Sequence, residues 1–170
     1  MRVLIISVLL IVNMILEATL LQSVRIFGVK PDFAIMIIVA FSILRGSSYG
    51  AFIGFGSGLL VDMMFGRTIG INALSYMLTG YIIGQAHENV FKDSIIPAVI
   101  FNAAAIIISQ HIFFVLAYFS QNITSDGISY LNALTSIILP QCLYNAVIGG
   151  LLYKLLYRLD EMDIMDKRIY

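Results

Sequence analysis

Glycines recur at every fourth residue in an apolar stretch of the first half of the chain, at positions 46, 50, 54 and 58. Where such a stretch is helical, residues four apart lie on successive turns of nearly the same face. A glycine leaves the backbone bare there, so a second helix can approach closely, as in the small-xxx-small contacts of membrane helices. The four-residue row continues through Asp62 to Gly66 and Gly70. This spacing predicts helix packing, with one carboxylate near the end of the packed row.

The glycine row also drifts around the helix axis. Each four-residue step overshoots a full turn by about 40°. On a straight helix, Gly46 and Asp62 are therefore expected to face different surfaces. The early glycines would contact a neighbouring helix of the same bundle, and the end with Asp62 would face elsewhere.

The composition places this row in a membrane protein. Charged residues make up 12% of the 170 residues, hydrophobic residues make up 60%, and the mean hydropathy is +0.95. A soluble domain carries about 25% charged residues. The net charge is 0, which gives no indication of a nucleic-acid partner. Cys142 is the single cysteine, which excludes an internal disulfide and a multi-cysteine metal site.

Six apolar segments emerge when the chain is compared with the roughly 20 residues that a helix needs to span a bilayer. They cover about residues 3–22, 31–45, 49–65, 69–84, 94–119 and 130–157. The second to fourth are short and glycine-rich, which is typical of helices that break or lie inside a bundle. The sequence predicts an all-α, polytopic membrane helix bundle of about six transmembrane helices, in a single domain over residues 1–170 with a short cytoplasmic tail at 158–170. A five-span arrangement, in which two short segments merge, stays open.

The basic residues predict the orientation. With six spans and a cytoplasmic N-terminus, three of them (Arg25, Lys30 and Arg67) fall outside, and the others fall inside. Cytoplasmic loops carry the excess of Lys and Arg in membrane proteins. We therefore expect both termini in the cytoplasm.

Asp62 has two interpretations that the sequence leaves open. An ionisable group within a span costs several kcal/mol unless it is paired or wet. Asp62 is then either a polar anchor or ligand contact, with Arg67, Arg25 or Lys30 as candidate partner, or a carboxylate that snorkels toward the membrane surface or caps the next turn of the chain. Motifs of hydrolases, metalloproteases and nucleotide-binding loops are absent from the sequence. We expect no enzymatic activity, no catalytic residue, no cofactor and no metal.

Several positions together resemble the MreD family of bacterial rod shape-determining proteins. They are Pro31-Asp32, Leu44-Arg45-Gly46, Gly50, Gly54-Phe55, Gly58-Leu59-Leu60, Asp62, Gly70, Asn72-Ala73-Leu74-Ser75-Tyr76 and Gly80-Tyr81. The resemblance implies helix-packing or partner-interface glycines at Gly46, Gly50, Gly54, Gly58, Gly70 and Gly80. It also implies polar intramembrane or turn positions at Asp32, Arg45, Asp62 and Asn72. The fold it implies is similar to the substrate-binding subunits of energy-coupling-factor vitamin transporters.

The resemblance implies a non-enzymatic, multi-pass subunit of the cell-wall elongation machinery in the bacterial cytoplasmic membrane. Its expected partners are MreC, the MreB cytoskeleton, RodA, a class B penicillin-binding protein and membrane lipid, with the glycine row receiving a partner's span. Whether the chain forms a homo-oligomer stays open. The alternative is a membrane subunit that binds a vitamin-like substrate for uptake, with Asp62 in the site.

Overall fold

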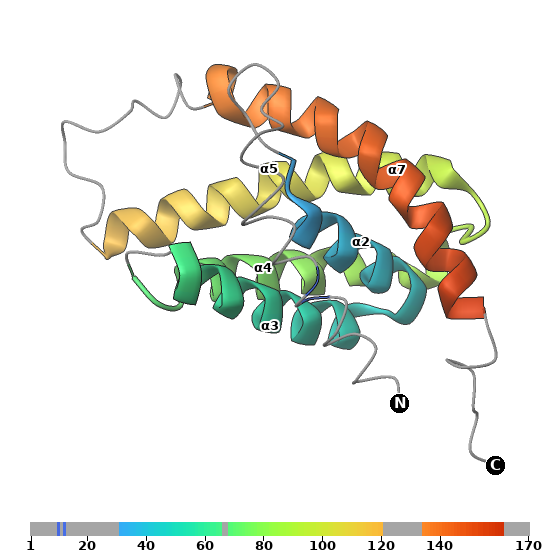
Figure 1. Ribbon diagram of the computed structural model, residues 1–170, viewed down its shortest axis with the longest axis horizontal. Coiled ribbons are helices and arrows are strands. Elements are labelled where there is room, and N and C mark those ends of the chain that lie inside the picture. The colour runs from blue at the N-terminus through green and yellow to red at the C-terminus, as the bar shows by residue number, and fades with distance from the viewer. Residues whose placement is uncertain (1–9, 11, 13–30, 66–67, 121–133, 162–170) are drawn as a thin grey trace, which may run out of the picture.

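The computed structural model of the protein describes residues 10, 12, 31–65, 68–120 and 134–161 (Figure 1). The regular structure of these residues is helical throughout, as the all-α prediction requires. The main helices are α2 (Phe33–Arg45), α3 (Ser47–Phe65), α4 (Ile71–Gly84), α5 (Ile95–Phe119) and α7 (Leu139–Glu161). A 3₁₀ turn, η1 (His87–Asn89), precedes α5, and a π-helical turn, η2 (Leu134–Ile138), leads into α7. Most of the predicted first span at 3–22 and the end of the tail at 162–170 lie outside the described residues.

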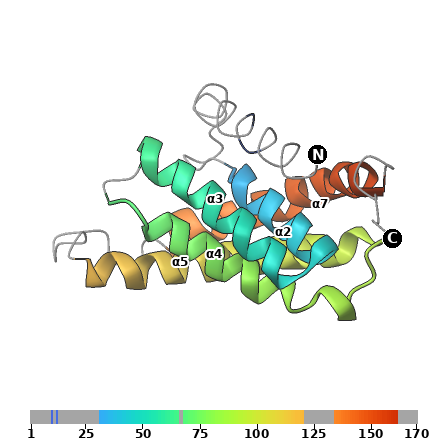
Figure 2. The ribbon, with the colours of Figure 1, turned by 90° about the horizontal axis from the view of Figure 1, so that it is seen from below.

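Helix α2 is the centre of the bundle. Its 13 residues extend only about 20 Å, which is less than the hydrocarbon thickness. Every residue from Ala34 to Leu44 is buried, and the helix contacts α3, α4, α5 and α7 (Figures 1 and 2). A helix that is apolar on all sides has to be surrounded by other helices or by lipid, and the neighbours of α2 are other helices. The prediction that a short segment lies inside the bundle is confirmed for α2.

The third segment is longer than the sequence suggested. Helix α3 begins at Ser47 and has 19 residues, so together with the 25-residue α5 it is long and apolar enough to cross a membrane. Its short appearance came from the polar residues Ser47 and Ser48, which the helix includes as its first turn. The described residues thus contain two helices that are both long and apolar enough to span, and the count of six spans stays a prediction.

The described basic residues gather at one end of the bundle, which we name the basic end: Arg45, Lys92, Lys154 and Arg158. Three hydrogen bonds connect the chain segments there. They run from the His87 ring to the carbonyl of Ile43 (2.6 Å), from Tyr153 to the carbonyl of Lys92 (2.8 Å) and from Tyr157 to Asp93 (2.5 Å). The opposite end holds the start of α2, the last turn of α3 and the start of α4. We name it the polar end, because two buried carboxylates lie there.

Candidate functional site

The glycines of α3 bring its backbone directly against the backbone of α4. A methyl group on Gly54 would lie 2.6 Å from the carbonyl carbon of Tyr76, and one on Gly58 would lie 2.6 Å from Cα of Ala73. From the other side, a methyl group on Gly80 would lie 2.5 Å from the carbonyl carbon of Gly50. Carbon atoms in contact are normally about 3.5–4.0 Å apart. No residue larger than glycine fits at these positions without separating the two helices.

The expectation that this glycine face receives a partner's span is therefore wrong for the structure described here, because α4 already covers it. The drift argument is right that the early glycines contact a neighbouring helix of the same bundle, which is α4, but it is wrong that Asp62 faces a different surface. Asp62 contacts α4 as Gly50 does, because rows of residues four apart are inclined about 26° to the helix axis and a crossing helix can follow them. Gly84, which the sequence analysis did not single out, completes the contact: a methyl group there would lie 2.5 Å from the nitrogen of Ser47.

Two of the six predicted glycines lie in turns. Gly46 (φ +92°) ends α2 and separates it from α3, and Gly70 (φ +109°) is the residue before α4. Glycine adopts positive φ without the steric cost that other residues meet. Gly46 also belongs to the close helix contact, because a methyl group on Gly84 of α4 would lie 2.7 Å from its carbonyl carbon. At Gly70 the row reflects backbone conformation, so its assignment to helix packing is corrected.

Asp62 caps the helix that follows its own. Its carboxylate accepts hydrogen bonds from the backbone nitrogens of Gly70 (2.8 Å), Asn72 (3.2 Å) and Ala73 (3.0 Å), and from the side-chain nitrogen of Asn72 (2.8 Å). The first backbone N–H groups of a helix have no partner within it. Gly70 stands at the capping position but has no side chain to accept them, and Asp62 of α3 does so instead. Of the two interpretations of Asp62, capping is the one that these bonds support.

The second buried carboxylate, Asp32, joins three helices. One of its oxygens accepts the N–H of Ile35 (3.0 Å) and so caps α2, while the other accepts the hydroxyl of Tyr76 on α4 (2.6 Å). Its backbone N–H donates to the side-chain oxygen of Asn145 on α7 (3.0 Å). Asp32 is only 7% exposed. The Pro31-Asp32 pair therefore starts α2 at a point where α4 and α7 both contact it.

Replacing Tyr76 by phenylalanine should destabilise the bundle by about 1.5–3 kcal/mol, the usual value of a hydrogen bond to a charged group. The measurement is the free energy of unfolding of the purified protein in detergent. Tyr81→Phe is the matched control, because Tyr81 lies on the same helix with 48% of its surface exposed. Equal effects of the two changes would contradict a structural role for the contact between Tyr76 and Asp32.

The structure brings Asp32, Asp62 and Asn72 together at the polar end and places Arg45 apart from them. Arg45 is the last residue of α2 and lies half-buried at the basic end. The site residues that the sequence analysis did not select are Tyr76 and Asn145. Both were visible as polar residues within apolar segments, but their partner Asp32 lies 44 and 113 residues away in the chain. Hydrogen bonds between residues so far apart in the chain leave no pattern in the local sequence.

Comparison with known proteins identifies the family. The family model described as rod shape-determining protein MreD matches residues 1–162, which include every helix described above. No curated protein and no solved structure matches the chain. The chain therefore belongs to the MreD family of rod shape-determining membrane proteins.

Proposed function

We propose that the protein is a non-enzymatic scaffold of the cell-wall elongation machinery in the bacterial cytoplasmic membrane. It would bind MreC and help to link the MreB cytoskeleton to RodA and a class B penicillin-binding protein. The observation that carries this proposal is the family match over residues 1–162. The family's description names a role in cell shape, so it gives no support to the alternative of an uptake subunit.

The charge distribution supports a cytoplasmic position for the basic end. The four described Lys and Arg residues lie there, and positive residues favour the cytoplasmic side. The polar end, with Asp32 and Asp62, would then lie in the outer half of the membrane. This orientation agrees with cytoplasmic termini.

We place the contact with the single span of MreC on the outer face of α5, since the glycine face of α3 is covered by α4. Ile100, Ile107, His111 and Val115 are exposed along this face. His111 is the polar member of this otherwise apolar row. An ionisable side chain that faces lipid at membrane depth costs free energy. A protein contact at His111 is therefore favoured over exposure to lipid.

This face can be tested with two tryptophan substitutions, each at an exposed apolar position. Ile107→Trp on α5 should reduce co-purification of MreC at least tenfold and fail to restore rod shape in cells depleted of the native protein. Val147→Trp, on the exposed face of α7, should leave both unchanged. Both variants should insert and remain folded, because the new side chains point out of the bundle. Loss of MreC with Val147→Trp but not with Ile107→Trp would contradict this placement, and retention of rod shape after depletion would contradict the proposed function itself.

A further inference from the structure

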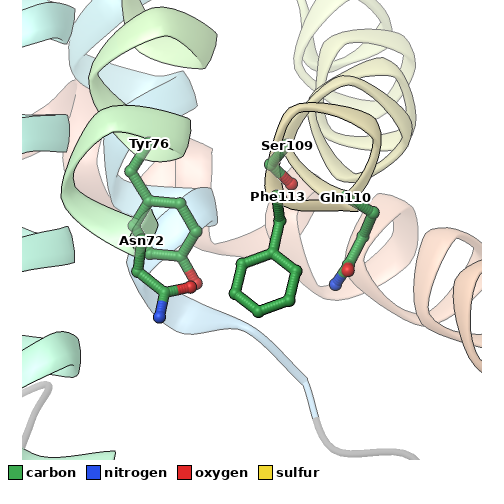
Figure 3. Close-up of a pocket in the computed structure, with 5 residues that line it drawn as sticks. All are labelled: Asn72, Tyr76, Ser109, Gln110 and Phe113. Atoms are coloured by element: carbon green, nitrogen blue, oxygen red, sulfur yellow. The ribbon is translucent and has the colours of Figure 1, made fainter. Parts of the chain in front are cut away.

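A pocket of about 260 Å³ lies between α4 and α5 at the polar end (Figure 3). Its lining residues are Asn72 and Tyr76 of α4 and Ser109, Gln110 and Phe113 of α5. Four of these five side chains are polar, although polar groups are costly at membrane depth unless they are bonded or solvated. The volume is several times the share of about 30 Å³ that one water occupies in the liquid. The pocket has the size and the polarity of a site for a small polar group.

Each polar side chain of the lining already donates a hydrogen to a group outside the pocket. Two of these hydrogens go to the buried carboxylates described above. The four bonds are Asn72 Nδ2 to Asp62 (2.8 Å), Tyr76 Oη to Asp32 (2.6 Å), Ser109 Oγ to the carbonyl of Ile106 (3.0 Å) and Gln110 Nε2 to Gln141 Oε1 (3.2 Å).

These bonds decide which hydrogen-bonding groups the lining retains. A hydroxyl that has donated its hydrogen can still accept, and a side-chain amide keeps its carbonyl oxygen and a second N–H. The lining therefore offers the oxygens of Asn72, Ser109 and Gln110 as acceptors, but only the remaining N–H groups of Asn72 and Gln110 as donors. The ring of Phe113 adds an aromatic face, which attracts cations. A ligand rich in donors and positively charged fits this set best.

We propose that the pocket binds a primary ammonium group, as carried by the headgroup of an ethanolamine phospholipid. A primary ammonium has three donors, no acceptor and one positive charge. Its charge would be favoured by Asp62 and Asp32, each of which lies one hydrogen bond behind the lining. None of the five lining residues is a cation, so an anionic group is disfavoured. Asn72 and Tyr76 lie in the first two turns of α4, at the end of a helix where headgroups are within reach.

The ligand class can be tested by thermal unfolding of the full-length protein in detergent, since a ligand that binds only the folded state raises Tm. Phosphatidylethanolamine should raise Tm, and phosphatidylcholine should need at least a tenfold higher concentration, because its trimethylated nitrogen has no hydrogen to donate. Soluble ethanolamine distinguishes a free amine from a lipid headgroup as the source of the ammonium group. If it acts at the same concentration as the lipid, the pocket recognises a free amine, and if only the lipid acts, the ligand is a headgroup. Equal effects of the two lipids would overturn the proposal.

The location can be tested with variants that remove lining oxygens. Ser109→Ala, and separately Gln110→Leu combined with Gln141→Leu, should each raise the concentration of phosphatidylethanolamine needed for half of the Tm increase about tenfold. Ser57→Ala is the matched control, because Ser57 is a buried serine that also donates within its own helix, but on α3 (2.8 Å to Ile53). It should change that concentration less than twofold. If both lining variants fold and respond to the lipid as the unmodified protein does, the ammonium site is not this pocket. Neither test depends on the contact with MreC proposed above.

Discussion

Replacing Gly54 by leucine should lower the free energy of unfolding by about 3 kcal/mol or more, which would leave most of the protein unable to form the α3–α4 contact. Overpacking a core commonly costs about 1–3 kcal/mol when side chains can adjust. Here the atoms that a new side chain meets belong to the backbone of Tyr76 and Met77, which cannot turn aside. The measurement is the unfolding free energy in detergent, together with the folded fraction after membrane insertion.

Gly56→Leu is the control for this experiment, since Gly56 lies on the same helix two residues away. Among the residues that the structure describes, the nearest side-chain atom to a methyl group there is Cδ1 of Leu10, at 3.9 Å. Both variants replace a helical glycine by the same residue, so they share the gain in helix propensity. Gly56→Leu should therefore be close to neutral. Equal stability of the two variants would show that α3 and α4 are not in backbone contact.

The variants Gly54→Leu and Gly56→Leu also distinguish a defect in folding from a defect in the contact with MreC. If α4 covers the glycine face, co-purification of MreC with Gly54→Leu should fall only as far as the folded fraction falls. A fully folded Gly54→Leu protein that has lost MreC would instead place the partner on this face, and it would contradict the contact on α5 proposed above.

Replacing Asp62 by alanine should be comparably damaging, at about 3 kcal/mol or more. The change leaves the backbone N–H groups of Gly70, Asn72 and Ala73 without their acceptor; that of Ala73 is buried and the other two are partly buried. A buried donor without a partner costs about 1–3 kcal/mol. The negative charge is also favourable where it stands, at the N-terminus of α4. The measurements are the free energy of unfolding in detergent and amide hydrogen exchange, which should become faster at residues 70–73 before the rest of α4.

Asp62→Asn and Asp93→Ala complete this series. An asparagine can still accept through one oxygen, so its effect should lie between those of the unmodified protein and Asp62→Ala. Asp93→Ala removes an exposed carboxylate that bonds to Tyr157, and it should change stability by less than about 1 kcal/mol. Unchanged exchange at residues 70–73 in Asp62→Ala would show that Asp62 does not cap α4.

Local sequence patterns predicted several parts of this structure. The shortness of the apolar run that begins after Asp32 favoured a helix that breaks or lies inside the bundle, and α2 lies inside it. The four-residue glycine spacing predicted close helix packing, since bare backbone on one face serves that purpose. The family resemblance, which is specific over about residues 17–84, was confirmed by the family match over residues 1–162.

The sequence by itself thus determined the helical class, the buried helix and the existence of a close helix contact. Only the tertiary structure decided that α4 fills the glycine face, that Asp62 caps α4, and that Asp32 meets Tyr76 and Asn145. The physical reason is that helical periodicity is a property of neighbouring residues, whereas the partner of a bare backbone or a buried carboxylate depends on how helices cross. The pocket between α4 and α5 also depends on how helices cross. Its lining comes from residues of two helices that are more than 30 positions apart in the chain and face one another only in the folded bundle.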